Sequence, residues 1–185
     1  MTAFYRSAYG NPEKYGIDHF VLLASCRAGN VIGGGAWARD RLIPNTVRAV
    51  QNGDAVYVRD ISATRPWMHV LDALSGYLSV GERLLNGDVT CGKPWNFGPA
   101  DENSVSVVGA LKIMQKYWSD IKIEIDPETR PHEARLLNLD CSQAIIELGW
   151  KPIWKTEKVF EMTALWYKTF LDKNIAISSE QINQY

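Results

Sequence analysis

The 185-residue chain has little cysteine, little histidine and no excess of charge of either sign. Its three cysteines, Cys26, Cys91 and Cys141, are widely spaced and lack any CxxC or Cys/His ligand pattern. This disfavours a disulfide framework and a metal site, and predicts reduced thiols in a cytoplasmic protein. With 20 Lys+Arg against 21 Asp+Glu the net charge is -1, which argues against a broad nucleic-acid-binding surface.

Long apolar runs are also missing. Residues 1–10 have no apolar stretch typical of a secretion signal, and no segment approaches the roughly 18 apolar residues of a spanning helix. The sequence therefore predicts a soluble protein with no membrane partner. Hydrophobic residues make up 46% and charged residues 22%, which excludes intrinsic disorder and is typical of a globular domain with one core.

Hydrophobic periodicity predicts an α/β fold. The apolar run at residues 19–26 is typical of a strand buried on both faces of a parallel sheet, and the glycine-rich segment 27–35 follows at its carboxyl end. Helices are predicted at 2–9, 40–51, 70–85, 104–118, 140–148 and from Thr156 onward, and strands at 55–59, 95–99, 122–125 and 136–139. The seven tryptophans are expected in the core, and the polar tail from Asn174 to be loosely held.

Two features of the sequence could bind an anion. Gly33-Gly34-Gly35 has neither GxGxxG nor GxxxxGK[ST] spacing, so a structural turn is favoured over a phosphate loop. Asn30, just before it, would still present an amide near the carboxyl edge of the sheet. Arg65, beside Pro66 and Trp67, is suited either to clamp a phosphate or to stack on the indole, and the two readings stand about even.

Other charged or titratable residues carry weaker signals. Arg41 at a helix start is unfavourable for the helix dipole, which suits an anion partner, although a solvated charge is the commoner case. His132 lies in an extended segment without a Ser or Cys nucleophile motif, which favours binding or structure over proton transfer. His69 is expected to cap or pack a helix. These residues indicate an anion-binding domain and identify no reaction.

Longer motifs carry a specific resemblance. The segment Arg-Ala-Gly-Asn-Val-Ile-Gly-Gly-Gly-Ala-Trp-Ala-Arg-Asp-Arg-Leu-Ile-Pro at 27–44 closely resembles the signature of CDP-glucose 4,6-dehydratases, which are extended short-chain dehydrogenase/reductases. The similarity continues through residues 65–71, 75–78, 95–99, 131–134, 148–152 and 180–183. It implies a nucleotide-sugar lyase of deoxysugar and lipopolysaccharide O-antigen biosynthesis. Such enzymes use NAD to oxidise the sugar at C4, eliminate water across C5 and C6, and return the hydride to C6.

The resemblance covers only part of that enzyme. The family's YxxxK and dinucleotide glycine motifs have no counterpart here, since Tyr5, Tyr9 and Tyr15 are followed four residues later by Tyr9, Glu13 and His19. The expected architecture is the C-terminal part: the last Rossmann strand(s) at 1–35 and a small α+β substrate-binding domain at 36–185. This part is expected to be inactive alone, within a full-length enzyme that is a homo-oligomer.

Motif by motif, the resemblance also implies a set of ligand contacts. A CDP-glucose substrate would contact Asn30, Arg41, Leu42, Tyr57, Arg65, Asn96 and His132, with no catalytic residue or metal ligand in this chain, and NAD would reach only Ala28. Ala36 and Asn45 depart from the family's usual Asp. Three alternatives stay open: a part of a dehydratase or epimerase for another nucleotide sugar, a non-catalytic binding or oligomerisation module, and a remnant that is not stably folded.

Overall fold

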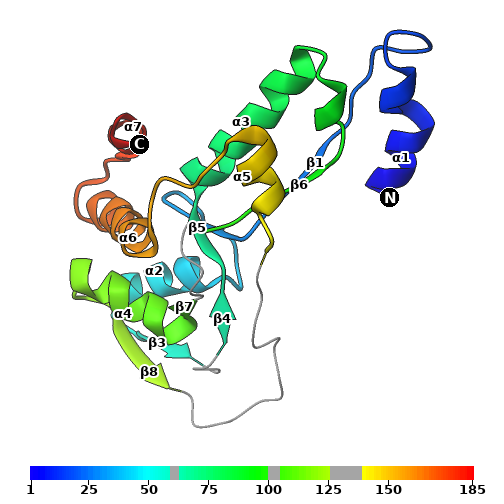
Figure 1. Cartoon of the computed structure of the whole chain (residues 1–185). Helices are drawn as coiled ribbons and strands as arrows, with labels where there is room; N and C mark the ends of the chain where they lie inside the picture. The colour runs from blue at the N-terminus through cyan, green and yellow to red at the C-terminus, as the bar shows by residue number, and fades with distance from the viewer. Residues whose placement is uncertain (59–62, 100–104, 126–138) are drawn as a thin grey trace.

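A computed structural model describes residues 1–58, 63–99, 105–125 and 139–185 (Figure 1). The helices are α1 (Thr2–Tyr9), α2 (Leu42–Asn52), α3 (Val70–Leu85), α4 (Val107–Tyr117), α5 (Ser142–Leu148), α6 (Thr156–Lys173) and α7 (Ser178–Gln184), with the 3-10 turns η1 (Pro12–Lys14) and η2 (Val89–Cys91). The strands are β1 (Ser25–Ala28), β2 (Asn30–Ile32), β3 (Ala55–Val58), β4 (Thr64–Arg65), β5 (Trp67–His69), β6 (Pro94–Phe97), β7 (Val105–Ser106) and β8 (Lys122–Ile125).

The strands form short pairs. Within the described ranges, β1 pairs with β6, β2 with β5 and β3 with β8, all in parallel, while β4 and β7 are antiparallel. The parallel pairs are joined through helices, as parallel connections require. The mixed α/β class predicted from periodicity is confirmed, and the predicted bounds of α1, α3 and β8 agree with the structure.

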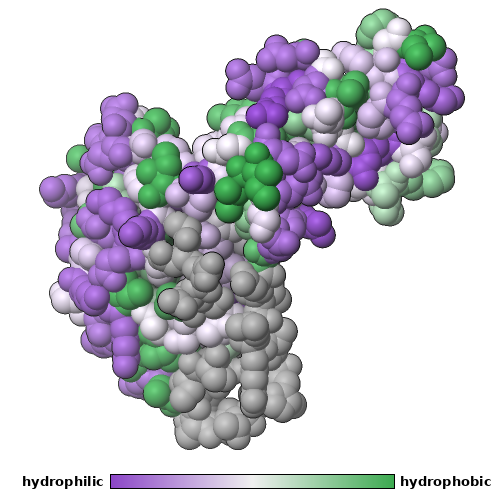
Figure 2. All heavy atoms as spheres, in the orientation of Figure 1, coloured by the Kyte–Doolittle hydropathy of each residue, from purple (hydrophilic) through white to green (hydrophobic). Residues whose placement is uncertain are grey.

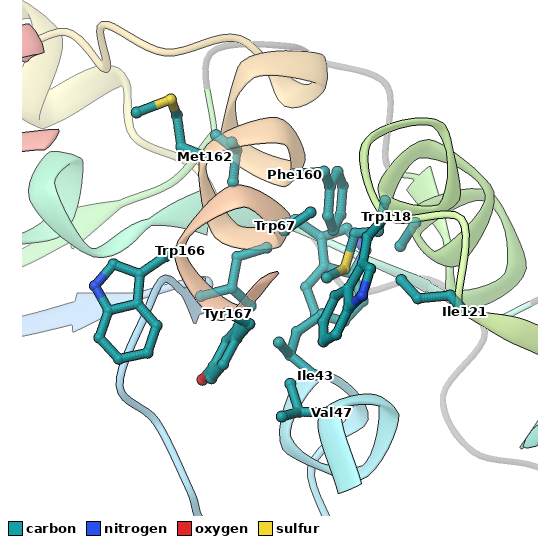
Figure 3. Close-up of a cluster of buried hydrophobic side chains, with 14 of the residues drawn as sticks. Ile43, Val47, Trp67, Trp118, Ile121, Phe160, Met162, Trp166 and Tyr167 are labelled. Atoms are coloured by element: carbon teal, nitrogen blue, oxygen red, sulfur yellow. The ribbon is translucent and has the colours of Figure 1, made fainter. Parts of the chain in front are cut away.

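The larger hydrophobic cluster joins α2, α4 and α6. Ile43 and Val47 of α2 meet Trp118 and Ile121 beyond α4 and Phe160 of α6 (Figure 3). All five side chains are almost completely buried. Removing apolar side chains from water at this scale is the main force that holds these helices together.

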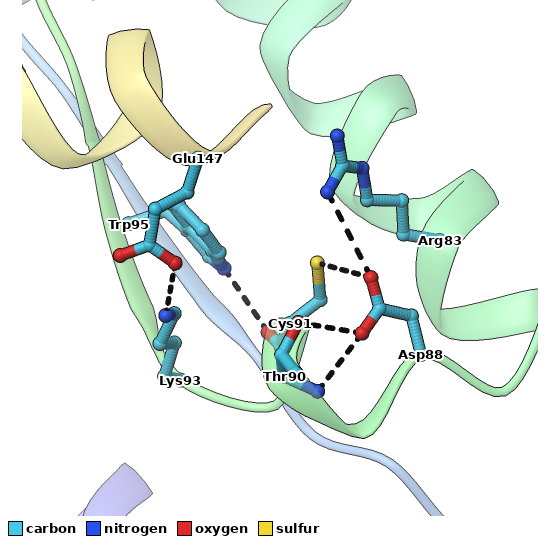
Figure 4. A network of polar contacts seen from close by, with 7 residues as sticks. All are labelled: Arg83, Asp88, Thr90, Cys91, Lys93, Trp95 and Glu147. Carbon is cyan, nitrogen blue, oxygen red and sulfur yellow. Dashed lines mark hydrogen bonds and ion pairs between the residues drawn. The ribbon is translucent and has the colours of Figure 1, made fainter. Parts of the chain in front are cut away.

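A second cluster surrounds β1 and β6. Trp95 and Phe97 of β6 pack with Met68, with Val80 of α3 and with Trp150 beyond α5. Phe97 contacts the Trp150 ring edge-on, with centroids 4.9 Å apart. Polar contacts lie at the end of the cluster where β6 begins: Cys91 donates to Asp88, Arg83 pairs with the same carboxylate, and Lys93 pairs with Glu147 (Figure 4). The tryptophans are thus core residues as predicted, except Trp37, which is 41% exposed.

The predicted strand at residues 19–26 is wrong in its position. The strand begins only at Ser25, and Phe20 and Val21 are 79% and 47% exposed. Its register explains the shift, because Ser25 lies opposite Pro94, the first residue of β6, and the chain before Pro94 turns through η2. Upstream of Ser25 there is consequently no extended partner among the described residues.

The predicted loose tail is also wrong. α7 packs on α6, with Gln181 donating to Met162 O at 2.7 Å and the Trp166 indole donating to Ser178 Oγ at 2.9 Å. The hydroxyl of Tyr185 reaches Asp72 in α3. The polar composition of the tail misled the prediction, because hydrogen bonds hold it together with the apolar packing of Ile177 and Tyr185 against the larger cluster.

Candidate functional site

The carboxyl end of β1 gathers several of the predicted site residues. Ala28 lies opposite Phe97, and the preceding pair sets Arg27 opposite Asn96. The backbone N–H of Gly29 donates to Phe97 O at 3.1 Å, and that of Asn30 donates to Pro66 O at 2.8 Å. Ala28, Asn30 and Asn96 therefore lie together, next to the segment that carries Arg65.

Other parts of the protein occupy the space where a side chain would stand at the glycines of this segment. A Cβ on Gly29 would lie 2.3 Å from Pro66 O, and one on Gly33 would lie 2.8 Å from Val70 Cγ1. On Gly34 a Cβ would stand 2.0 Å from the Trp166 ring. These approaches need glycine because the neighbouring backbone and indole leave no room for a side chain. The structural reading of the glycine triplet is confirmed, and the triplet is no phosphate cradle.

Asn96 presents an acceptor without a partner. Its amide Nδ2 donates to Asp140 O at 3.0 Å, while its Oδ1 is buried and makes no hydrogen bond within the described part of the chain. Leaving such an oxygen unpaired is unfavourable by about 1–3 kcal/mol. A ligand hydroxyl is one group that would satisfy it.

Arg65 is half-buried in β4, opposite Val105 of β7. Its Nη1 donates to Thr64 O at 2.8 Å. Trp67 faces the other way into the core, where its indole N–H donates to Val105 O and its ring packs edge-on against Phe160. The indole of Trp67 is thus buried in the core, whereas Arg65 is only half-buried.

Arg41 and Leu42 lie where α2 begins. Arg41 is exposed in an extended conformation, and its carbonyl accepts the first helical hydrogen bond, from Asn45 N at 2.9 Å. Leu42 is the first helical residue and packs against the larger core, so its side chain is directed inward. Arg41 is therefore the more accessible of the two.

Tyr57 lies in β3, opposite Glu124 of β8, with 67% of its surface exposed. The negative charge of Glu124, and the hydrogen bond between its carboxylate and the phenol, raise the pKa of Tyr57, so the hydroxyl stays protonated. β3 belongs to a different strand pair from those of Asn30 and Asn96. His132 and most of the predicted strand at 136–139 lie outside the described residues.

Side chains of Tyr167 and Arg48 bind the backbone of residues 36–38, which follow the glycines. The Tyr167 hydroxyl donates to Ala36 O at 2.6 Å and accepts from Ala36 N at 2.9 Å. Arg48 donates to the carbonyls of Trp37 and Ala38, and to Asn45 Oδ1 at 2.6 Å. The hydrogen bonds from Tyr167 and Arg48 thus form with Ala36 and Asn45 in place, without the carboxylates that the resemblance leads one to expect at these two positions.

A buried polar network at the start of α3 was missed by the sequence reasoning. Asp72 is buried, and its Oδ1 accepts from Ile153 N at 2.7 Å and from the Tyr185 hydroxyl at 2.9 Å. Ser75 accepts from the Trp150 indole and meets the same hydroxyl at 3.0 Å. Burial raises the pKa of Asp72, although the hydrogen bonds oppose the rise. The signal available in the sequence was an aspartate on the buried face of a helix.

His69 caps α3, as expected. Its Nδ1 accepts from Leu71 N at 3.3 Å and its ring lies 4.5 Å from that of Trp154. Burial lowers the pKa of His69 to about 4, because the imidazolium would be charged inside the core. The ring is therefore neutral at pH 7, and its role is to cap α3 and to pack against Trp154.

The residues present do not build a site for a metal or for a whole dinucleotide. No group of three or more His, Cys, Asp or Glu gathers around a common point in the ranges that the structure covers. After Ala28, the space beside Gly29, Gly33 and Gly34 is occupied by Pro66, Val70 and Trp166. It is therefore not open to receive a diphosphate. No helix of the described residues has the length and apolarity needed to cross a membrane.

The chain was compared with known proteins by sequence. The chain is 41% identical over 188 residues to CDP-glucose 4,6-dehydratase from Salmonella typhimurium, a match that takes in 100% of this chain and 52% of that protein. The chain thus spans about half the length of this curated relative.

Solved structures share the fold at low identity. They include UDP-glucose-4-epimerase from Stenotrophomonas maltophila with bound NAD, at 18% identity and a TM-score of 0.69, covering 83% of this chain and 50% of that one. Another is dTDP-glucose 4,6-dehydratase from Bacillus anthracis in complex with NAD, at 21% identity and a TM-score of 0.63, covering 93% and 50%. The fold expected for an extended short-chain dehydrogenase/reductase is confirmed. The sequence model of GDP-mannose 4,6 dehydratases matches residues 13–163, and the chain belongs to this family.

Proposed function

We propose that the chain supplies the nucleotide-sugar-binding part of a CDP-glucose 4,6-dehydratase and is inactive alone. The observation that carries the proposal is the 41% identity to the Salmonella enzyme along the whole chain. Other known relatives by fold act on UDP- and dTDP-sugars, so the base is chosen on the sequence match. The protein is proposed to act in the cytoplasm, within a homo-oligomeric enzyme.

The proposed binding residues divide into two groups. Asn30 begins β2, two residues after the end of β1, and Asn96 lies in the neighbouring β6, where its Oδ1 would accept from a sugar hydroxyl. Arg65, near Asn30, would bind the diphosphate, because a guanidinium can donate two parallel hydrogen bonds to phosphate oxygens.

The second group would meet the nucleotide. Arg41 and Leu42 would approach it from the start of α2, and Tyr57, exposed on β3, would line the base site. His132 completes the proposed set. NAD would be held by a part that this chain does not contain, with contact here at Ala28 alone, and none of the residues above is assigned a chemical step.

The division of the chain at residue 35 belongs to the same proposal. Residues 1–35 would adjoin the NAD-binding Rossmann domain, and residues 36–185 would bind the sugar nucleotide. The cluster around β1 is completed by α3, β6 and α5, which come later in the sequence.

Isothermal titration with CDP-glucose, CDP, UDP, GDP and dTDP tests the proposal. CDP-glucose should bind, and Arg65→Ala should weaken it roughly 10- to 100-fold, as expected for losing about 1.5–3 kcal/mol of charge-assisted hydrogen bonds. Arg65→Lys should restore binding only in part, because an ammonium cannot bind two oxygens in one plane.

Arg83→Ala is the matched control. Arg83 lies in the last turn of α3, roughly 20 Å along the helix from Val70 at 1.5 Å per residue, and pairs with Asp88 (Figure 4). It should leave the affinity unchanged. Equal affinity of Arg65→Ala and the parent would contradict the diphosphate contact, and tighter binding of UDP or dTDP would contradict the choice of CDP.

A further inference from the structure

Two tryptophans of the segment between α5 and α6 lie behind the strands that carry the proposed asparagine contacts. The first, Trp150, is buried, and its ring meets that of Phe97 in β6 edge-on. Phe97 directly follows Asn96 in the chain and is completely buried. Because side chains in a close-packed core have little free space, a shift of Trp150 would displace the strand residue next to Asn96.

The second tryptophan, Trp154, lies behind the strand of Asn30. Its ring centroid is 4.5 Å from that of His69, which stands opposite Ile32 where β5 pairs with β2. The Nε2 atom of His69 also lies 3.4 Å from where a Cβ of Gly33 would stand, so the imidazole contacts the glycine segment itself. Trp154 thus supports, through one ring, the strand that begins at Asn30.

Polar contacts fix the segment that carries both tryptophans. The Trp150 indole donates to Ser75 Oγ at 3.0 Å, and the N–H of Ile153 donates to Asp72 Oδ1 at 2.7 Å. Asp72 and Ser75 lie three residues apart on α3, so both contacts are made to one face of that helix. Asp72 is completely buried, so each hydrogen bond that it accepts replaces one that water would otherwise give.

Tyr185 links these contacts to α7. Its hydroxyl lies 2.9 Å from Asp72 Oδ1 and 3.0 Å from Ser75 Oγ, and its ring meets that of Trp154 edge-on, with centroids 5.4 Å apart. The exposed residues of α7 are mostly polar, and this end of the molecule is largely hydrophilic in Figure 2. We call Asp72, Ser75 and Tyr185 the α3–α7 network.

We infer that the α3–α7 network positions the sugar-binding site, by holding the two tryptophans against the strands that carry Asn30 and Asn96. Its three residues are positioning residues and are assigned no contact with the ligand. Because coupling between two sites is reciprocal, the docking of Tyr185 should favour binding of the sugar nucleotide, and binding should in turn favour the docked network. The identity of the ligand rests on the proposed function, whereas the coupling of the network to the two asparagines does not.

NMR spectra of the ligand-free chain test the coupling. Tyr185→Phe removes one oxygen and keeps the aromatic ring, so the variant should remain folded. We expect it to shift the backbone amide signal of Asn30 and the side-chain amide signals of Asn96, neither of which the Tyr185 hydroxyl contacts. Tyr117→Phe is the matched control, because its hydroxyl also bonds a carboxylate, that of Glu157 at 3.2 Å, and joins α4 to α6 outside the network. It should leave both asparagine signals in place, and unmoved signals in Tyr185→Phe would overturn the proposal.

Titration with CDP-glucose gives a second measurement, made at a temperature at which both variants are folded. Tyr185→Phe should weaken binding roughly fivefold or more, which is the lower end of the usual coupling between two sites, and Tyr117→Phe should not. A Tyr185→Phe protein that loses only thermal stability and keeps the parent's affinity would overturn the proposal, since the network would then serve the fold alone. If the parent itself does not bind CDP-glucose, the proposed function is wrong, and the asparagine signals alone decide whether the network is coupled to the site.

Discussion

Replacing Gly34 by alanine separates a packing role for the glycine segment from a ligand-binding one. The new Cβ would lie 2.0 Å from Cγ and Cδ2 of Trp166, whereas carbon atoms rest about 3.5–4.0 Å apart. The indole would therefore have to move by about 1.5 Å or more. Trp166 is 5% exposed and packs within the larger hydrophobic cluster, so the indole has to displace neighbouring side chains as it moves.

The magnitude follows from what the movement disrupts. The indole N–H donates to Ser178 Oγ at 2.9 Å, and the ring stacks on Phe170 with centroids 5.2 Å apart. Overpacking costs about 1–3 kcal/mol and a lost hydrogen bond about 1 kcal/mol. We expect Gly34→Ala to lower the free energy of unfolding by about 3 kcal/mol, or roughly 6–12 °C in Tm.

Urea unfolding and thermal melts followed by tryptophan fluorescence measure the effect. Gly81→Ala is the matched control, because it lies inside α3 with no atom within 4 Å of the new Cβ, and should gain about 0.5–1 kcal/mol. A Gly34→Ala protein with the parent's Tm would refute the packing argument. If it kept its stability but no longer bound CDP-glucose, the segment would be a ligand loop after all.

The remaining predictions concern pH and charge. Tyr185→Phe should destabilise by about 1.5–3 kcal/mol at pH 8 and by less at pH 4, because the hydroxyl opposes the raised pKa of Asp72 and matters most once the carboxyl is ionised. The pKa of His69 is about 4, below the ordinary 6.5. Keeping this imidazole neutral therefore contributes about 3 kcal/mol to the free energy of unfolding above pH 6.5, and this contribution is lost as the pH falls toward 4. His69→Asn should reduce that loss of stability, measured by urea unfolding at a series of pH values. Asn45→Asp should add a surface ion pair with Arg48, stabilising by at most about 1 kcal/mol and only at low salt.

Each of these has a contrary outcome. Tyr9→Phe, at an exposed site on α1, should change nothing, and a Tyr185→Phe effect of the same size at pH 4 and pH 8 would show that Asp72 is not the partner that matters. An unchanged acid profile in His69→Asn would assign the acid sensitivity to other groups. Stabilisation by Asn45→Asp that persists in 1 M NaCl would argue against a surface ion pair.

The sequence predicted those elements whose signals are local. α3 carries its own cap at His69 and an apolar stripe of helical period, and its predicted bounds agree with the structure. The run at 19–26 has equally strong apolar character, but a strand exists only where a partner lies beside it, and β6 begins opposite Ser25. Strand position is thus a long-range property that composition along the chain does not contain.

In the candidate site, too, residues within sequence motifs were identified, whereas contacts between distant parts of the chain were missed. Asn30 and Asn96 were singled out through motifs, and the structure places them near each other because β6, which carries Asn96, pairs with β1, and Asn30 follows β1 closely in the chain. The network of Asp72, Ser75 and Tyr185 was missed because it joins residues more than 100 positions apart. All the proposed ligand contacts stay predictions: Ala28, Asn30, Arg41, Leu42, Tyr57, Arg65, Asn96 and His132.

The position of β5 couples the unfolding of the two hydrophobic clusters. In this three-residue strand Trp67 belongs to the cluster of α2, α4 and α6, while its neighbour Met68 belongs to the cluster of β1 and β6. Successive side chains of a strand point to opposite faces, so one strand forms the wall between two interiors. Neither interior can open without exposing a face of that wall, and the amide protons of residues 67–69 should exchange with solvent only when both interiors open together.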